Sequence, residues 1–378
     1  MSRVKRIQQL LDASKLDSID RYFDHEYARS LSKNVLEFLG RNYFRPRLIG
    51  FDEPDFPATS GTPLIYAGNH SGMSFPWDAI MFSASLYAKR GYEMQDACRA
   101  LVAPALSLTS IMNPYFIDNF WKKTGGVDAS LGNFEELLQR PGAAVLIYPE
   151  GIAGIGKGFE KRYQLQRFSN SFIRMALKFK TDIVPVLTVN GEFINPMGYK
   201  SDFLNSLAQK VGIPFVPVGP ITALVTLFPW SFYFGLPARL TYLQGRRISL
   251  REIAGTDYDQ MGQRELNQIR IKVQESIQTD LDQAVADYGK DPFAVEELLQ
   301  IWIENRDQFL YIFPSGWPLL FKEHERLFLR DTTASMSHDN LSYLKALWSH
   351  PGILAYHTPF YGWPMLLSRH GLGMRKNN

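Results

Sequence analysis

Apolar positions along the chain alternate between short continuous runs and three- or four-residue spacings. The runs are typical of buried strands and the spacings of amphipathic helices. Pro141-Gly142 marks a turn between a helix and a strand. Strands that alternate with helices of this length predict an α/β fold, a layered sheet with flanking helices over roughly residues 40–250. The expected strands are 63–67, 99–103, 143–148 and 183–189, and the expected helices are 77–87, 133–139, 168–179 and 263–288.

The two ends of the chain have a helical pattern. Residues 3–40 predict a pair of N-terminal helices, with Gly40 as the stop of the second. Residues 293–378 are rich in aromatic side chains and turn signals, which indicates a mainly helical C-terminal extension. We therefore expect N-terminal helices at 1–40, a main α/β domain at 41–290 and a helical extension at 291–378.

The segment 211–238 contains no charged residue, and five prolines interrupt it. It cannot be one continuous helix, because proline lacks the amide hydrogen that an inner helical turn requires. A membrane interface and a buried core position both fit this composition. No run of 18 apolar residues predicts a spanning helix, and the basic N-terminus lacks the apolar stretch of a signal peptide.

Composition and charge narrow the class of protein. Of the 378 residues, 45% are hydrophobic and 21% charged, which is typical of a globular protein. The net charge of +3 is too small to indicate a nucleic-acid partner. Lys and Arg outnumber Asp and Glu by ten to six in residues 1–50 and by eight to two in 140–180. Such stretches suit a phosphate-bearing ligand or an anionic membrane, although a solvated face fits them as well.

The single cysteine excludes an internal disulfide framework and a cysteine-based zinc site. Cys98 stands at the start of an expected strand, where a packing role is the simplest interpretation. Five of the seven histidines lie in the C-terminal extension without the spacing of metal ligands, so we expect no metal site. A reducing cytoplasmic location fits this cysteine content.

The first candidate for chemistry is His70, in a glycine-flanked loop directly after an expected strand. Ligands of α/β folds bind at this edge of the sheet. Imidazole titrates near neutral pH and can take a proton from an alcohol if a carboxylate holds its tautomer. Asp78 is the closest acid in sequence, at the start of the following helix.

A second candidate is Tyr148-Pro149-Glu150-Gly151, which follows the strand 143–148. Glycine beside an acid lets a substrate approach the backbone closely. The adjoining residues 151–158 nearly match a phosphate-binding loop, but Gly158 stands where a magnesium-binding Ser or Thr is required. A nucleotide-triphosphate site is therefore not expected.

In combination and in order, these stretches resemble the lysophospholipid and glycerolipid acyltransferase family. Asn69-His70 with Asp78 is similar to its first motif, and 148–151 to its third. Residues 125–130 resemble the second motif and 183–186 the fourth. The sequence of 158–168 resembles the monoacylglycerol acyltransferase-like branch in particular. The resemblance covers about residues 60–290 and does not reach the C-terminal extension.

The resemblance implies transfer of an acyl group from a thioester, acyl-CoA or acyl carrier protein, to a lipid hydroxyl, with no further cofactor. His70 would be the general base, Asp78 would orient it, and Asn69, Glu150 and Gly151 would help to position the acceptor. The phosphates of the donor would meet a set of basic residues, for which a solvated face is the alternative: Lys157, Lys161, Arg162 and Arg167. A place in phospholipid biosynthesis and a peripheral position on the cytoplasmic side of a membrane follow.

Two features depart from the family pattern. Its first motif has four residues between His and Asp, whereas seven lie between His70 and Asp78, so the longer loop must fold back. Ala129-Ser130 and Ile152-Ala153 stand where phosphate-binding arginines are usual, which favours a neutral or atypical acceptor over lysophosphatidate. Two other functions stay open: a non-catalytic lipid- or acyl-carrier-binding protein of this fold, and a thioesterase in which His70 activates water.

Overall fold

A seven-stranded sheet forms the centre of the molecule in the computed structural model, which describes residues 19–52, 61–72, 75–93, 98–108, 112–210, 218–250 and 261–364. The strand order is β1-β7-β6-β2-β5-β3-β4, and the pairs are parallel except β6 with β7. The expected α/β class and the four expected strands are confirmed. The strands are β1 (Arg47–Ile49), β2 (Leu64–Gly68), β3 (Cys98–Val102), β4 (Val127–Asp128), β5 (Ala144–Ile147), β6 (Ile183–Val189) and β7 (Thr241–Gln244).

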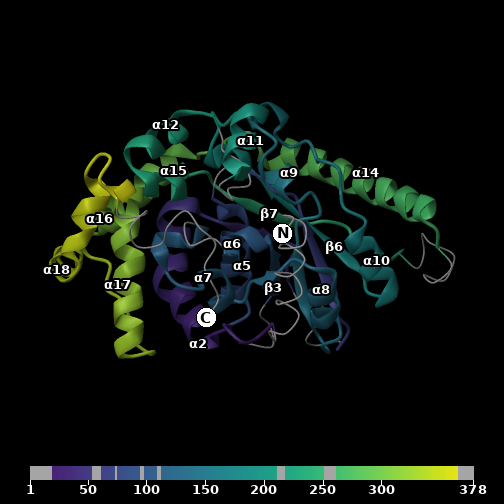
Figure 1. Ribbon diagram of the computed structural model, residues 1–378, viewed down its shortest axis with the longest axis horizontal. Coiled ribbons are helices and arrows are strands. Elements are labelled where there is room, and N and C mark those ends of the chain that lie inside the picture. The colour runs from purple at the N-terminus through teal and green to yellow at the C-terminus, as the bar shows by residue number, and fades with distance from the viewer. Residues whose placement is uncertain are drawn as a thin grey trace.

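Helices cover both faces of this sheet, and each face has its own apolar core (Figure 1). One core is built with α8 (Leu131–Leu138), α10 (Ser171–Lys178) and α14 (Gln263–Tyr288). The other is built with the N-terminal helix, α5 (Trp77–Lys89), α7 (Phe120–Lys123) and α17 (Trp317–Arg330). The helices expected from periodicity are therefore present, and α14 has the bounds expected for it. The remaining short helices are α6 (Pro104–Leu108), α9 (Ile152–Ile155), α11 (Asp202–Lys210) and α12 (Pro220–Leu227).

The second expected N-terminal helix is present, whereas the first falls in residues 1–18, outside the described part of the chain. Its segments are α2 (His25–Leu31), a π-helical turn (Ser32–Leu36), α3 (Glu37–Leu39) and a second π-helical turn (Gly40–Phe44). The expected stop at Gly40 is wrong, because this glycine keeps right-handed helical angles and its carbonyl accepts the Arg45 N–H (2.7 Å). The helix ends instead at Arg45, where φ is 44° and a proline follows.

Arg45 also ties three distant segments together. Its buried guanidinium donates to the carbonyls of Pro237 (2.6 Å), Phe293 (2.7 Å) and Ala294 (3.1 Å). Arginine suits this position because its planar fork carries five donors in fixed directions. The end of the N-terminal helix is thereby fixed to the start of the C-terminal segment.

The C-terminal extension is mainly helical, as expected, and packs into the same core as the N-terminal helix. The ring of Trp317 lies 5.1 Å from that of Trp77 and 5.8 Å from that of Phe44, between centroids. Figure 1 shows this region beside the N-terminal helix. The division into 1–40, 41–290 and 291–378 stays a prediction. The extension consists of α15 (Val295–Glu304), α16 (Phe309–Ile312), α17 and α18 (Asn340–Ser349).

The described part of the uncharged segment is broken, as its prolines require, and its two halves differ in burial. Helix α12 exposes Pro220, Ala223 and Leu227, whereas Trp230 and Tyr233 in the following 3₁₀ turn are buried in the core. Residues 211–217 lie outside the described part. Among the described residues, none of the helices combines the length and the apolar character needed to cross a bilayer.

Candidate active site

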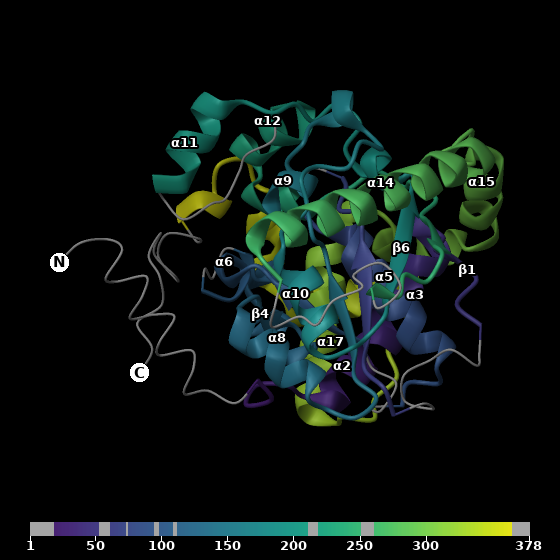
Figure 2. The same cartoon turned by 90° about the vertical axis from the view of Figure 1, so that its right-hand side faces the viewer.

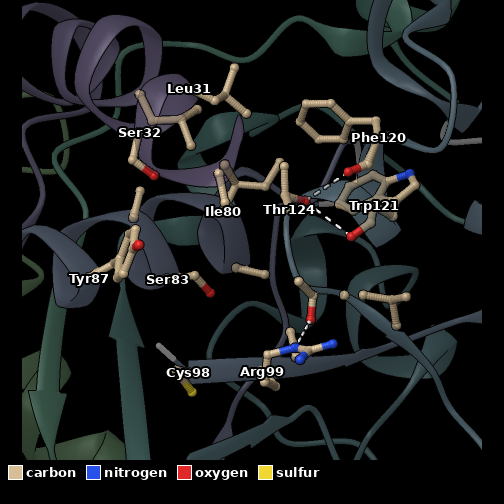
Figure 3. Close-up of a pocket in the computed structure, with 18 of the residues that line it drawn as sticks. Leu31, Ser32, Ile80, Ser83, Tyr87, Cys98, Arg99, Phe120, Trp121 and Thr124 are labelled. Atoms are coloured by element: carbon tan, nitrogen blue, oxygen red, sulfur yellow. Dashed lines mark hydrogen bonds between the residues drawn. The ribbon is translucent and has the colours of Figure 1, made fainter. Parts of the chain in front are cut away.

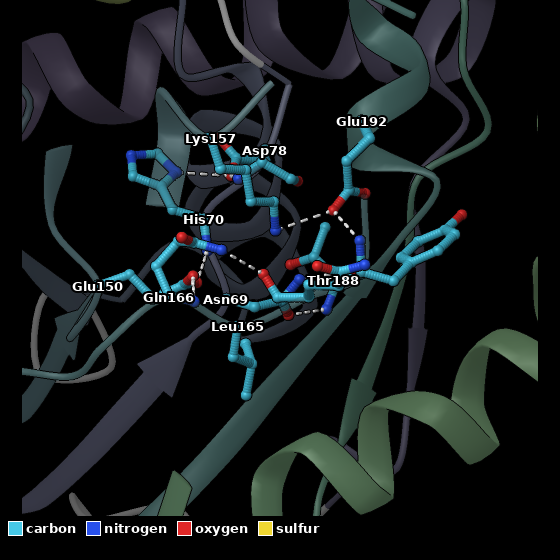
Figure 4. Close-up of polar contacts among 12 residues, drawn as sticks. Asn69, His70, Asp78, Glu150, Lys157, Leu165, Gln166, Thr188 and Glu192 are labelled. Carbon is cyan, nitrogen blue, oxygen red and sulfur yellow. Dashed lines mark hydrogen bonds and ion pairs between the residues drawn. The ribbon is translucent and has the colours of Figure 1, made fainter. Parts of the chain in front are cut away.

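His70 and Asp78 meet at the edge of the sheet where the parallel strands end (Figure 4). His70 is the second residue after β2, and Asp78 lies in the first turn of α5. His70 Nδ1 and Asp78 Oδ2 are 2.8 Å apart, and the Asp78 side chain is fully buried while 14% of the His70 side chain is exposed. The imidazole therefore has one nitrogen held by a carboxylate and one edge open to a ligand.

Contacts of Ser71, Gly72 and Phe75 hold the loop between His70 and Asp78 in a folded-back conformation. The Ser71 N–H donates to Asp78 Oδ2 (3.0 Å), so the same carboxylate oxygen binds both the loop and the imidazole. Gly72 has φ of +99°, and a Cβ there would lie 3.0 Å from the Gly191 carbonyl oxygen. Phe75, where a spacing of four residues after His70 would have placed the acid, is buried and packs on Trp77 with ring centroids 5.2 Å apart. The three extra residues are thus accommodated without separating His70 from Asp78.

Tyr148 packs on the imidazole, a contact that sequence reasoning missed. The two rings are stacked, with centroids 4.3 Å apart and an angle of 29°. Gly68 makes room for this ring, because a Cβ at that position would lie 2.7 Å from Tyr148 Cε1. Burial raises the pKa of Tyr148 well above its ordinary value, so the phenol stays neutral beside the histidine. The stack and the Asp78 bond together fix the plane of the imidazole.

Both oxygens of the Glu150 carboxylate accept hydrogen bonds from backbone N–H groups. Its Oε1 accepts the His70 N–H (3.1 Å), and its Oε2 accepts the Gln166 N–H (2.5 Å). Burial raises the pKa of this carboxyl, with Lys157 and the two N–H donors acting in the opposite direction. Glu150 therefore positions the His70 main chain, while the neighbouring Gly151 is exposed with φ of +57°.

Asn69 and Lys157, both expected to bind substrate, are buried against protein partners. The Asn69 side chain donates to the Thr188 carbonyl (3.0 Å) and accepts the Thr188 N–H (2.7 Å), which joins the ends of β2 and β6. Lys157 Nζ lies 3.2 Å from Glu192 Oε1, and both side chains are almost fully buried. In this conformation both side chains face protein groups. Glu192 was not identified from the sequence, because nothing there links it to Lys157.

The other three expected phosphate-binding residues, Lys161, Arg162 and Arg167, are exposed. Arg162 lies over the ring of Phe159, 5.0 Å from its centroid. Arg167 lines an open cleft at the ends of β3 and β5, with Glu150 and Gly151. The remaining lining residues are Leu101, Ala129, Phe134, Ile147, Tyr148, Pro149, Phe168, Ser169, Asn170 and Ser171. Arg167 and Gly151 are therefore near each other, whereas Lys157 is turned inward.

A mostly apolar pocket lies between α5, β3 and the N-terminal helix (Figure 3). Ala79 and Ile80, which follow Asp78 directly, line it, together with Ser83 and Tyr87 further along α5. Its wall includes Cys98, whose burial raises the pKa of the thiol to about 12, in keeping with a packing role. In the described part of the chain, no group of three or more His, Cys, Asp or Glu side chains is arranged to hold a metal ion.

Comparison with known proteins places these features in context. Residues 53–189 match the profile of the family described as Acyltransferase. Over 247 residues the chain is 30% identical to uncharacterized proteins of Mycobacterium leprae and Mycobacterium tuberculosis, covering 64% of this chain and 61% and 63% of theirs. The chain thus spans less than two thirds of the length of these curated relatives.

The similarity to a solved structure is weaker than the match to the family profile. The crystal structure of the 1-acyl-sn-glycerophosphate (LPA) acyltransferase PlsC from Thermotoga maritima aligns with 75% of this chain and 89% of its own, at 14% identity and a TM-score of 0.36. The family match contains all four stretches at 69–78, 125–130, 148–151 and 183–186.

Proposed function

We propose that this chain is an acyltransferase that moves a fatty acyl group from a thioester donor to a lipid hydroxyl, with His70 as general base. The observation that carries the proposal is the hydrogen-bonded pair of His70 and Asp78 at the open edge of the sheet. The match of residues 53–189 to an acyltransferase profile supports it. The whole protein is proposed to work peripherally on a membrane.

The proposed reaction needs no nucleophile from the protein. With Nδ1–H bonded to Asp78, Nε2 of His70 takes the proton of the acceptor hydroxyl as its oxygen attacks the thioester carbonyl carbon. The tetrahedral intermediate then breaks its carbon–sulfur bond, and the thiolate leaves with the proton from Nε2. Asp78 stabilises the imidazolium between these two steps, as in a Ser-His-Asp triad in which the substrate supplies the serine oxygen.

The apolar pocket suits the acyl chain. Its lining includes Ala79 and Ile80, the two residues that follow Asp78 in the chain, and Ser83 and Tyr87 further along α5. At its wall Arg99 is engaged, because its guanidinium donates to the Gly125 carbonyl (2.6 Å) and to Asp20 (2.8 Å). Burying each methylene of a chain in such a pocket contributes about 0.8 kcal/mol.

The open cleft suits the acceptor. It adjoins His70 through Tyr148 and Glu150, and its lining includes Ala129 and Gly151 in place of larger side chains. Ala129-Ser130 and Ile152-Ala153 supply no arginine, which leaves Arg167, proposed to face the donor, as the arginine among the lining residues of the cleft. A phosphomonoester acceptor therefore lacks the two usual charge-assisted contacts, of about 1.5–3 kcal/mol each. The proposed acceptor is therefore a neutral or atypical lipid. The exposed Lys161, Arg162 and Arg167 are proposed to meet the phosphates of the donor, acyl-CoA or acyl carrier protein.

An acyl-transfer assay of the purified full chain tests the function. Both donor types are offered with lysophosphatidate, lysophosphatidylcholine, lysophosphatidylglycerol and monoacylglycerol, and products are identified by mass spectrometry. We expect transfer to a neutral or diester acceptor at least about tenfold faster than to lysophosphatidate. Fastest transfer to lysophosphatidate would refute the proposed acceptor, acceptor-independent hydrolysis would indicate a thioesterase, and absence of both would indicate a binding protein.

Filling the pocket tests the path of the acyl chain. Ser83→Leu adds two heavy atoms and replaces a hydroxyl with apolar volume on the pocket side of α5. We expect the preferred acyl chain to shorten, with the rate for long chains falling about fourfold for each methylene that no longer fits. Ser85→Leu is the matched control, because Ser85 lies on the same helix but lines a different surface cleft. The measurement is kcat/KM over a series of acyl-CoA lengths, and equal profiles for both variants would show that the chain lies elsewhere.

A further inference from the structure

A set of exposed apolar side chains lies along the edge of the molecule formed by α9, α11 and α12. We call it the apolar rim, and it consists of Ile152, Met197, Tyr199, Phe203, Leu227 and Phe360. Phe203 is the most exposed of the six side chains, at 72%, and Tyr199, Met197 and Ile152 are about half exposed. Figures 1 and 2 both place α9, α11 and α12 along the same edge. Side chains of this size are costly to leave in water when they lie close together.

Backbone contacts hold the parts of the rim next to one another. Tyr199 and Val218 exchange two hydrogen bonds (2.9 and 2.8 Å), which joins the approach to α11 with the approach to α12. The Phe360 N–H donates to the Leu227 carbonyl (2.8 Å), so a segment near the end of the chain lies against the end of α12. The Phe159 N–H donates to the Gly198 carbonyl (2.9 Å), which fixes the loop after α9 beside Met197 and Tyr199.

Helix α12 has an unusual composition for an exposed helix. Its sequence, Pro-Ile-Thr-Ala-Leu-Val-Thr-Leu, contains no charged residue, yet Ala223, Thr226 and Leu227 are exposed and Leu224 and Val225 are only half buried. A surface helix in water normally presents charged or strongly polar side chains on its outer face. The absence of charge extends over the whole of residues 211–238.

The rim is connected to the catalytic loop. Ile194, at the start of the segment that carries Met197 and Tyr199, lies against Gly72, and a Cβ at Gly72 would be 3.5 Å from it. The Leu236 N–H donates to the Ile194 carbonyl (2.8 Å), and the Trp77 indole donates to the Tyr233 carbonyl (2.8 Å) at the start of α5. The segments that carry the rim therefore also hold the loop from His70 to Asp78.

We propose that the apolar rim docks onto the surface of a lipid bilayer, so that the acceptor lipid passes from the membrane directly into the site. This inference rests on the proposed function, because it assumes that the acceptor lipid must reach His70. Tyr and Phe at the edge of an uncharged helix fit the boundary between headgroups and acyl chains. The exposed cations Lys161 and Arg162, next to the Gly198 contact, add positive charge beside the rim that attracts an anionic membrane, in addition to their proposed role at the donor. A protein partner would not require exposed aromatic side chains, an uncharged helix and cations beside one another.

Vesicle binding tests the docking surface independently of turnover. Tyr199→Ser with Phe203→Ser removes two exposed aromatic rings, and we expect the affinity for vesicles to fall roughly tenfold for each ring. The matched control is Ile303→Ser with Leu329→Ser, which removes two side chains that are 66% and 75% exposed outside the rim. Cosedimentation with phosphatidylcholine vesicles, and with equal mixtures of phosphatidylcholine and phosphatidylglycerol, measures the affinity. Equal losses in the two double variants would overturn the proposal.

Two further measurements separate this proposal from the proposed function. His70→Ala should bind vesicles as the original chain does, while transferring acyl groups about 10²–10⁴-fold more slowly. A chain that binds vesicles through the rim but never transfers an acyl group would refute the function and leave the docking surface standing. When Phe203→Trp binds vesicles, the fluorescence of the added indole should shift to the blue and should be quenched by brominated lipids. An indole that stays in water, or rim variants that change only self-association in light scattering, would overturn the membrane assignment.

Discussion

Replacing His70 with alanine is expected to lower the rate of acyl transfer by about 10²–10⁴-fold, the usual contribution of a general base. The physical reason is that no other imidazole is described near the acceptor position, while Asp78 is buried and Glu150 is occupied by two N–H donors. The effect should fall on kcat, because substrate binding relies on the pocket and the cleft. Initial rates with a saturating acyl-CoA donor measure it.

A matched histidine serves as the control for His70→Ala. His350→Ala removes another partly buried imidazole, which bonds to Glu323 in the C-terminal region (3.0 Å). It should leave the rate of acyl transfer unchanged. Thermal unfolding of both variants reports on the fold, and a His70→Ala variant that stays folded and retains full activity would exclude the proposed mechanism.

Asp78→Asn is expected to lower the rate by about 10³–10⁴-fold, with little change in shape. The Ser71 N–H and His70 Nδ1 both meet Asp78 Oδ2, so an asparagine oxygen in that place can accept from both donors. It carries no negative charge, however, and the imidazolium that forms during proton transfer loses its counter-charge. The loss arises from the missing charge and not from a missing side chain.

The tautomer of His70 can be observed directly. Nitrogen NMR of the labelled chain should place the proton on Nδ1 both in the original protein and in Asp78→Asn. Asp280→Asn, which alters a carboxylate paired with Arg246 (2.8 Å), is the control and should preserve both tautomer and rate. A proton found on Nε2 in Asp78→Asn would mean that the loss of rate comes from the tautomer and not from the missing charge.

Much of the fold could be predicted from the sequence because its longer elements have clear periodicity. The strands at 64–68 and 183–189 are fully buried, and the stripe of α14 keeps its spacing over 26 residues. Three strands were not foreseen: β1, β4 and β7 have three, two and four residues. Runs so short carry too few residues to establish a period. Gly40 was misjudged because its helical neighbours decide its conformation, and not its own freedom.

The candidate site could be predicted only where chemistry and chain order coincide. His70 and Asp78 are close in sequence, and each follows a recognisable strand or helix signal. Tyr148 was part of a motif, but its stacking on His70 depends on the space above Gly68, which only the packed strands create. Lys157 was expected to be exposed, as lysine usually is, and its partner Glu192 lies in another loop. A pair of residues this far apart in the chain produces no local sequence pattern.

The shared core of the two chain ends has a consequence for how the protein is made. The Tyr27 hydroxyl bonds to Glu325 (3.0 Å), a contact that spans 298 positions, and Arg45 holds carbonyls at 237, 293 and 294. On the ribosome, the N-terminal helix therefore emerges long before its partners and must wait with its apolar face uncovered. Contacts of such long range slow folding. Synthesis of the segment from Phe293 to Glu325, and not of the sheet, is therefore the step that completes this core.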